Sequence, residues 1–503
     1  MNAPALIDTR AIRNGFGGGS VMCRVGLTVI ILLSALTGCT PRAVSTPDPD
    51  AIEARKGQVE TEQIKKNAIA EKVASQAPKQ DASAGAKPSI EKLAQETSLP
   101  ELIRFAAETS PAVVAEYHKY LAATHKKGQA FTLPDPQVMF SYNVIQMDRA
   151  DRKWELGVAQ EIPYPGSLVI AGKIADSEAK AAHLRYESVV RDAVAETKVA
   201  FFELYYIDRA QQVTEEIRKL YDRYAALAAG GEGVAKPKVP ETFRAESQRA
   251  QLGYDLTMLR EMRQAEVEDL RTCCGLPENA EIGRTQEIAD PPVLNLTLDQ
   301  LAAIAQKHNQ ELAAAGIEVE RAGLQRKLAH RAPIPKLTVG ASYVQTGDVS
   351  SGPDPTRNEV MVNVGMSVPL WFGKYRAMAR EANELETAAK ADQLAKRYGI
   401  RAELAKAYYK LNNASRLVRL YRETLLPQAR QALQSAEELY RKGEVNLAGL
   451  LETTATVHNF ELARLRATAD FYQNVATIEK MLGTALELKP AKAEGPSTEG
   501  PKP

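Results

Sequence analysis

Four segments of the sequence alternate between apolar residues and small or polar residues. A period of two predicts a β-strand with one apolar face, and runs of about 8 to 11 residues have the length of a tilted transmembrane strand. Two hairpins of a soluble sandwich would show the same pattern. Four strands are too few to close a membrane barrel, so only several associated copies could close one. The apolar positions are Val138, Phe140, Tyr142 and Val144; Trp154, Leu156 and Val158; Leu337, Val339, Ala341 and Tyr343; and Val360, Val362, Val364, Met366 and Val368.

Two other stretches predict unusually long helices. Residues 166–229 contain no proline, and residues 374–440 contain only Pro427. At 1.5 Å per residue, each helix would span roughly 100 Å. Narrow apolar stripes with steps of three and four indicate coiled-coil packing seams rather than a cofactor pocket. The clearest stripes are Val213, Ile217, Leu220 and Tyr224, and Phe471, Val475, Ile478 and Leu482.

The sequence also repeats itself at an offset of about 200 residues. Each half is predicted to contain a helix, a Pro-rich corner, a β segment, a second corner, a very long helix, a turn and a helix. The matching landmarks are residues 99–102 and 298–301, 134–138 and 333–337, 162–166 and 368–373, and Cys274-Gly275 and Leu482-Gly483.

Composition and charge exclude several functions. Charged residues make up 25% and aromatic residues 6% of the 503 residues, which favours extended helices over several aromatic-rich cores. The chain has 64 Lys and Arg against 63 Asp and Glu, so no net field attracts nucleic acid. No Gly-rich phosphate loop, HExxH pair or nucleophile elbow occurs, so we expect neither an enzyme nor a cofactor. His118 and His125 would share a helix face, but solvated or packed histidines are favoured over a metal site.

The N-terminal segment predicts export. After Arg10, Arg13 and Arg24, an apolar run of about a dozen residues has the length of a signal peptide and is too short for a membrane span. It ends in Leu36-Thr37-Gly38-Cys39, which resembles the lipobox of bacterial lipoproteins, and the resemblance implies that Cys39 becomes an acylated N-terminus. An ordinary secretory signal is the alternative. The absence of Asp at position 40 favours the outer membrane.

Two further features of the sequence are the polar segments outside the repeat and a pair of adjacent cysteines. Residues 39–96 contain few large apolar residues and are predicted to be a disordered tether, like the tail at 487–503. Cys273 and Cys274 precede a glycine and are expected in the last turn of a helix. A structural role is favoured there over redox or metal chemistry.

Together these features resemble the TolC-type outer-membrane efflux proteins. The sharpest matches are Val364–Lys374 leading to Ala382, and the turn Tyr440–Leu451. The resemblance covers about residues 97–486 and implies a mainly α protein with transmembrane β-strands. It would be a homotrimer with a twelve-stranded barrel, four strands per chain, continued by a periplasmic α-helical coiled-coil barrel. Residues 1–38 would be the signal peptide, 97–289 the first repeat and 290–486 the second.

The same resemblance implies an exit duct in the outer membrane. Its partners would be a periplasmic adaptor and an inner-membrane pump, often of the RND class, and its cargo small molecules, metal cations or polypeptides. Tyr440 falls on the family's gate tyrosine and Glu241 on an acidic position at the other tip. Val445 stands where some members place a basic residue. The alternative for Glu241 is a carboxylate near a helix N-terminus, and the alternative for the protein is a lipid-anchored periplasmic adaptor or scaffold.

Overall fold

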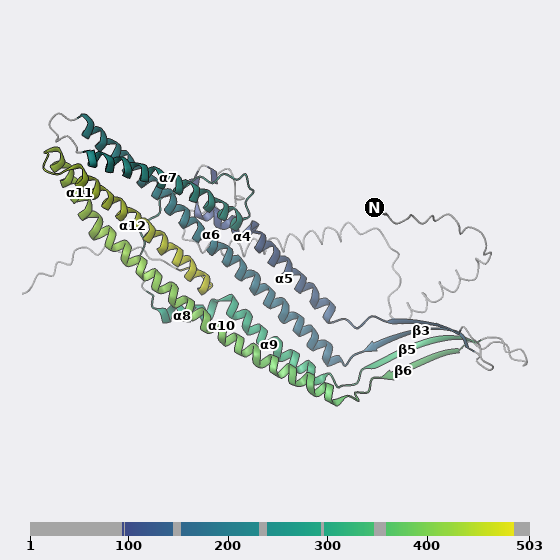
Figure 1. The fold of residues 1–503 in the computed structure, drawn as a ribbon. Helices are drawn as coiled ribbons and strands as arrows, with labels where there is room; N and C mark the ends of the chain where they lie inside the picture. The colour runs from purple at the N-terminus through teal and green to yellow at the C-terminus, as the bar shows by residue number, and fades with distance from the viewer. Residues whose placement is uncertain are drawn as a thin grey trace, which may run out of the picture. The chain divides into compact units, whose positions relative to one another are not determined.

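The computed structural model describes residues 93–94, 96–143, 152–230, 239–292, 296–346 and 359–486. All of them lie in one compact unit, residues 67–503. Long helices and one small antiparallel sheet make up most of this part of the chain (Figure 1). Cys39, the signal peptide, most of the tether and the tail lie outside the described residues.

The described chain passes twice through the same order of elements. The first half contains β1 (Glu96–Thr97), α4 (Leu99–Thr109), α5 (Pro111–Ala130), β2 (Gln137–Tyr142), β3 (Arg152–Ile162), α6 (Pro165–Gly230) and α7 (Val239–Cys274). The second half contains β4 (Arg284–Thr285), α8 (Leu298–His308), α9 (Gln310–Arg331), β5 (Leu337–Thr346), β6 (Glu359–Met366), α10 (Phe372–Leu420), η1 (Tyr421–Leu425), α11 (Leu426–Arg441) and α12 (Leu447–Leu482). The four predicted strands are confirmed as β2, β3, β5 and β6. Val144 lies outside the described residues, and Val368 follows the end of β6.

Each half opens with two helices instead of the single helix expected. In the first half, Pro111 stands at the start of α5. Proline has no N–H, and its ring disfavours a helical conformation in the preceding residue, so Ser110 is extended with φ −55° and ψ 126°. In the second half, the Asn309 side chain accepts a 2.9 Å hydrogen bond from the Leu312 N–H and begins a new helix.

The two long helices are confirmed, with one difference between them. Helix α6 is 66 residues long. Its counterpart contains Pro427, whose ring would clash with the carbonyl of Glu423 in a regular α-helix. The π-helical turn η1 lies directly before this proline, and the Leu426 N–H donates to the Tyr421 carbonyl five residues back. The wider turn lets the chain continue into α11 in spite of the proline.

Glycines end the last helix of each half, as predicted. Gly275 follows α7 with φ +64°, and Gly483 follows α12 with φ +74°. Only glycine adopts this left-handed conformation without a steric cost. The final helix of each half therefore ends at a glycine in the left-handed conformation.

The two halves pack together and do not form separate bodies. The sheet has the order β2-β3-β5-β6 with antiparallel neighbours, so β3 of the first half pairs with β5 of the second. Helix α6 packs along α9 and α12 of the second half as well as along α5 and α7. Both predicted apolar stripes pack against other helices: Ile217 and Tyr224 are buried, and so are all four residues of the stripe from Phe471 to Leu482.

Figure 1 shows the strands continuing from one end of α5, α6, α9 and α10. The end of α6, the start of α7, the end of α11 and the start of α12 lie at the other end of the helical part. None of the described helices combines the length and the hydropathy needed to span a membrane. Two regions are therefore of functional interest: the sheet, and the end of the helical part where α6, α7, α11 and α12 meet.

Candidate functional site

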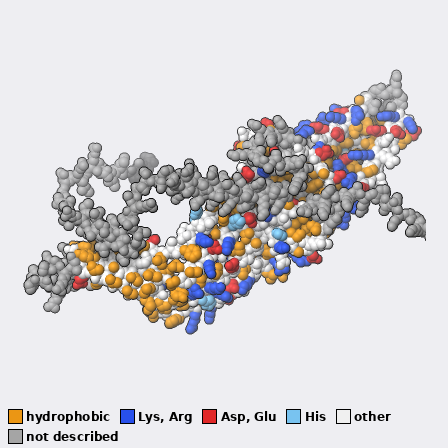
Figure 2. Space-filling view, turned by 180° about the vertical axis from the view of Figure 1, so that it is seen from behind, with side chains coloured by type: hydrophobic (Ala, Val, Ile, Leu, Met, Phe, Trp, Pro, Cys, Tyr) orange, Lys and Arg blue, Asp and Glu red, His pale blue; other side chains and the backbone are white. Residues whose placement is uncertain are grey.

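One face of the sheet carries rows of apolar side chains. Residues directly opposite in antiparallel strands lie on the same face. Phe140 lies opposite Leu156, Leu156 opposite Tyr343, and Tyr343 opposite Val360. The next row is Val138, Val158, Ala341 and Val362. On the outermost strands these side chains are exposed, with Phe140 at 67% and Val360 at 74%, and Figure 2 shows hydrophobic side chains gathered over this end of the molecule.

The opposite face consists mainly of small and polar side chains, with two methionines. Its rows include Met139, Gly157, Ser342 and Met361, and Gln137, Ala159, Gly340 and Asn363. A strand with one lipid-facing and one water-facing side needs this contrast. The alternation read from the sequence thus becomes a sheet with two chemically different faces.

The sheet has two open edges in the described chain. Strands β2 and β6 each pair with one neighbour only. The unpaired backbone N–H and C=O groups of an edge strand need hydrogen-bond partners, above all in an apolar surrounding. The sheet is therefore incomplete in a single copy of the chain if its apolar face contacts lipid.

The predicted gate residue Tyr440 lies just before the connection between α11 and α12. Tyr440 lies in the last turn of α11, and its side chain is 5% exposed. It is buried among apolar residues of four helices: Ile217, Tyr221 and Tyr224 of α6, Ala245 and Leu252 of α7, Ala436 of α11, and Leu447, Leu450 and Leu451 of α12. The end of α6, the start of α7, the end of α11 and the start of α12 thus share one apolar cluster, which we call the tip cluster. Tyr440 packs against its own chain there.

Hydrogen bonds reinforce the tip cluster. The Tyr224 hydroxyl donates to a carboxylate oxygen of Glu437, which joins α6 to α11. The Tyr221 hydroxyl donates to the Leu451 carbonyl at 3.1 Å, which joins α6 to α12. Burial raises the pKa of Tyr221 to about 12, so its phenol stays protonated. The sequence did not reveal these two hydrogen bonds, because the partners lie more than 200 residues away in the chain.

The second predicted gate residue, Glu241, is the third residue of α7. Its side chain lies outside the described residues, so the acidic position stays a prediction. Val445 lies in the turn between α11 and α12 and is partly exposed. The structure places both segments beside the tip cluster through Ala245 and Leu447.

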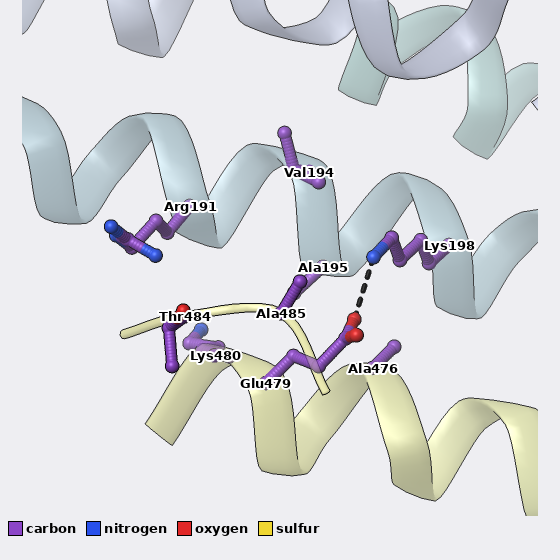
Figure 3. A pocket seen from close by; sticks show the side chains of 9 residues that line it. All are labelled: Arg191, Val194, Ala195, Lys198, Ala476, Glu479, Lys480, Thr484 and Ala485. Atoms are coloured by element: carbon purple, nitrogen blue, oxygen red, sulfur yellow. Dashed lines mark hydrogen bonds and ion pairs between the residues drawn. The ribbon is translucent and has the colours of Figure 1, made fainter. Parts of the chain in front are cut away.

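Polar contacts between α6 and α12 continue from the tip toward the ends of the halves. The Thr214 hydroxyl and the His458 Nε2 are 3.1 Å apart, and burial lowers the pKa of His458. Further along, Arg466 binds both carboxylate oxygens of Glu203 at 2.7 Å. Lys198 then binds Glu479 at 2.6 Å, and Figure 3 shows the two side chains pointing toward each other.

The cavity in Figure 3 is too small for a substrate. It lies between α6 and the end of α12 and has a volume of about 30 Å³, the space of one or two water molecules. Arg191, Lys198 and Lys480 line it together with Glu479. We interpret it as a packing defect at the end of a helix pair.

The remaining candidate residues fit structural roles. Cys273 and Cys274 end α7, as predicted, and both are free thiols. Burial raises the pKa of Cys274 to about 12, which keeps it protonated and unreactive. His118 and His125 lie on α5, where both are exposed. No group of three His, Cys, Asp or Glu side chains suited to a metal ion occurs among the residues that the structure describes.

Comparisons with known proteins agree with this architecture. Residues 301–484 match the family model "Outer membrane efflux protein". No curated protein sequence matches the chain. The resemblance read from the sequence is therefore confirmed for the second half of the chain.

Solved structures extend the likeness to most of the chain. The outer-membrane channel OprN shares 17% identity over 82% of this chain and 96% of its own, with a TM-score of 0.63. CusC, a protein that forms a transmembrane channel, shares 14% identity over 81% and 97%, with a TM-score of 0.64. The outer membrane protein VceC from Vibrio cholerae shares 16% identity over 80% and 100%, with a TM-score of 0.62. The described chain has the fold of the outer-membrane efflux channels.

Proposed function

We propose that the protein is the outer-membrane exit duct of a tripartite efflux system. The observation that carries the proposal is the open-edged sheet with one exposed apolar face. Three copies would supply twelve strands, pairing β2 of one copy with β6 of the next and leaving no edge in the lipid. The long helices of the three copies would continue the duct into the periplasm.

The oligomeric state tests this proposal. The mass of the full-length protein in detergent, with bound detergent subtracted, should be three times that of the chain. Circular dichroism on the same sample should show β-structure. A monomer that retained its full β-content would contradict the proposal, because four strands cannot satisfy both edges in a membrane.

We propose further that Cys39 carries the lipid anchor and that the protein is located in the outer membrane and extends into the periplasm. Most residues after Cys39 have too little apolar surface to belong to the core. The end of the predicted tether is a correction, because Leu93 is fully buried in the core and Glu96–Thr97 form a strand. The variant Cys39→Ala should therefore form the trimer after purification but reach the outer membrane more slowly. Loss of the trimer in this variant would make the tether a structural element.

The partners and cargo follow from the same class of protein. The duct would receive its cargo from a periplasmic adaptor and an inner-membrane pump, of the RND class by family resemblance. Metal cations, small organic molecules and polypeptides stay open as cargo. Affinity purification of the full-length protein after cross-linking in cells should recover an adaptor and a pump.

We also propose that the tips close the duct, with Tyr440 and Glu241 as the residues concerned. On a three-fold axis, three Glu241 carboxylates would repel one another and attract cations. Glu241→Gln should weaken block by divalent cations in planar-bilayer recordings, and Tyr440→Phe should raise the resting conductance. Unchanged cation block would leave Glu241 as a helix-terminal charge.

The alternative, a lipid-anchored adaptor or scaffold, is not favoured, because an adaptor would carry one helical hairpin and not two halves that share a sheet. Detergent dependence separates the two. A Cys39→Ala duct would still fractionate with the outer membrane, whereas a tethered soluble protein would be released.

A further inference from the structure

The two corners between the sheet and the helices differ in charge. In the second half, residues 327–336 and 366–380 lead into and out of the β5–β6 hairpin and contain no carboxylate. They carry six basic residues, which we call the basic corner: Lys327, Arg331, Lys336, Lys374, Arg376 and Arg380. Their shared sign favours an anionic partner.

The structure brings these two segments together. Leu337 pairs with Met366 at the base of the hairpin. The Lys336 N–H donates to the Ser367 hydroxyl at 2.8 Å, and the Ser367 N–H donates back to the Lys336 carbonyl at 2.9 Å. Helices α9 and α10 also pack side by side, with Arg326 binding Glu386 at 3.0 Å. The two segments that carry the basic corner therefore lie side by side.

Most cations of the basic corner have no carboxylate partner. Lys336 binds Glu161 at 2.8 Å, and Arg331 donates to the Gly166 carbonyl at 3.1 Å. Lys374, Arg376 and Arg380 are exposed and form no ion pair with any residue in the described ranges. These three side chains retain their hydrogen-bond donors for a ligand.

In the corresponding corner of the first half, two of the three basic residues are neutralised within the chain. Lys126 binds Glu178 at 2.8 Å, and Lys127 binds Asp176 at 2.6 Å. Both carboxylates belong to α6. The contrast shows that the basic corner is not a general consequence of the fold, and it provides an internal control.

Apolar side chains adjoin the basic corner on the side of the sheet. Leu370 is 68% exposed, Trp371 76% and Phe372 64%, and Lys374 follows directly. Strand β6, whose Val362 and Val364 are also exposed, ends four residues before Leu370. An indole next to lysine and arginine at the end of an apolar surface suits the interface between acyl chains and headgroups.

We propose that the basic corner binds anionic phospholipid. Headgroup phosphodiesters around the start of α10 would contact Lys374, Arg376 and Arg380, and the acyl chains would lie against Trp371 and β6. This inference rests on the proposed function, because it requires the apolar face of the sheet to lie in the membrane. The occupant is a lipid and not free phosphate, because the exposed apolar surface continues directly from the cations.

Tryptophan fluorescence provides a direct test, since the chain has only two tryptophans. In the full-length Trp154→Phe variant, Trp371 is the sole reporter. The protein is reconstituted into phosphatidylcholine vesicles that contain phosphatidylglycerol, with bromine on the acyl chains of one lipid or the other. Brominated phosphatidylglycerol should quench Trp371 with a relative association constant of about five, as expected for attraction by at least one unpaired cation.

A charge-neutral variant and a matched control identify the residues. The triple variant Lys374→Gln, Arg376→Gln and Arg380→Gln should lower the relative association constant to about one. The control triple variant Lys126→Gln, Lys127→Gln and Lys173→Gln removes as many charges at the first corner, where Lys173 is the third basic residue and is exposed on α6. It should leave the constant unchanged. Inorganic phosphate should have no more effect than sodium chloride of the same ionic strength.

The possible outcomes are distinct. Equal quenching by the two lipids, an equal loss in both triple variants, or full competition by inorganic phosphate would overturn the inference while leaving the duct intact. Quenching by neither lipid would contradict the proposed function itself. If the Trp154→Phe variant does not fold, the thermal unfolding midpoint of the wild-type protein in detergent is measured instead. Added phosphatidylglycerol should raise this midpoint more than added phosphatidylcholine. Equal rises would overturn the inference.

Discussion

Arg466 and Glu203 form a two-pronged ion pair between helices α12 and α6. The Nη1 atom of Arg466 lies 2.7 Å from both carboxylate oxygens of Glu203, although the residues are 263 positions apart in the chain. Arg466 also binds Asp470 at 2.6 Å, and Gln473 donates to Glu203 at 2.8 Å. One arginine thus joins the two halves in the middle of the long helices.

Removing this arginine should destabilise the protein measurably. Arg466→Met would leave the Glu203 and Asp470 carboxylates without their cation. Because the Arg466 side chain is 37% exposed, solvent reduces the effect, and we expect a loss of about 1–2 kcal/mol in the free energy of unfolding. Denaturant unfolding in detergent would measure it. Arg401→Met is the control, since its partner Asp299 is 83% exposed; equal losses in both variants would deny the Arg466 pair a special role.

Glu266 should make stability depend on pH. Burial raises its pKa to about 7, and the neighbouring Glu203 and Asp269 add to the rise, while Arg466 opposes it. The folded protein therefore holds a proton between pH 4.5 and pH 7 that the unfolded chain releases, so this group's contribution to stability falls as the pH rises through that window.

The variant Glu266→Gln tests this dependence. It should raise the free energy of unfolding by about 1–2 kcal/mol at pH 8, after allowance for partial exposure, and by little at pH 5. The measurement is the denaturant midpoint of both proteins at the two pH values. A gain that did not change with pH would show that the pKa of Glu266 is not raised.

Tyr224→Phe should loosen the tips. It removes the hydroxyl that donates to Glu437 and so weakens the connection between α6 and α11. We expect a higher resting conductance in planar bilayers with the trimer intact. Tyr254→Phe is the matched control, because Tyr254 is 65% exposed on α7. If the two variants had the same resting conductance, this hydrogen bond would have no part in closing the duct.

Gly483→Ala should lower the free energy of unfolding by more than the cost of a left-handed backbone conformation alone. At φ +74°, an added Cβ would lie 2.2 Å from the His308 carbonyl oxygen. Gly443 has nearly the same backbone, φ +76°, but no atom within 4 Å of such a Cβ. We expect Gly443→Ala to cost about 1 kcal/mol in the free energy of unfolding and Gly483→Ala clearly more. Similar costs would mean that the backbone near His308 can move away.

The sequence by itself determined the elements of this protein. Alternation located the four strands, the scarcity of proline located the long helices, and Gly275 and Gly483 marked the ends of the halves, because these signals act within a few residues. The family resemblance was also visible in short motifs such as the corner around Trp371. The breaks at Ser110 and Asn309 were missed, since a single proline or a cap residue does not outweigh a continuing apolar pattern.

Only the tertiary structure decided how the halves combine. That β3 pairs with β5, that Tyr224 meets Glu437, and that Arg466 meets Glu203 depend on contacts between residues far apart in the chain, and no local pattern encodes them. The difference between the corners also required the structure: lysines occur at both, but only packing shows that α6 neutralises Lys126 and Lys127 and leaves Lys374 exposed. A charge acts through its distance to other charges, and the fold alone sets those distances.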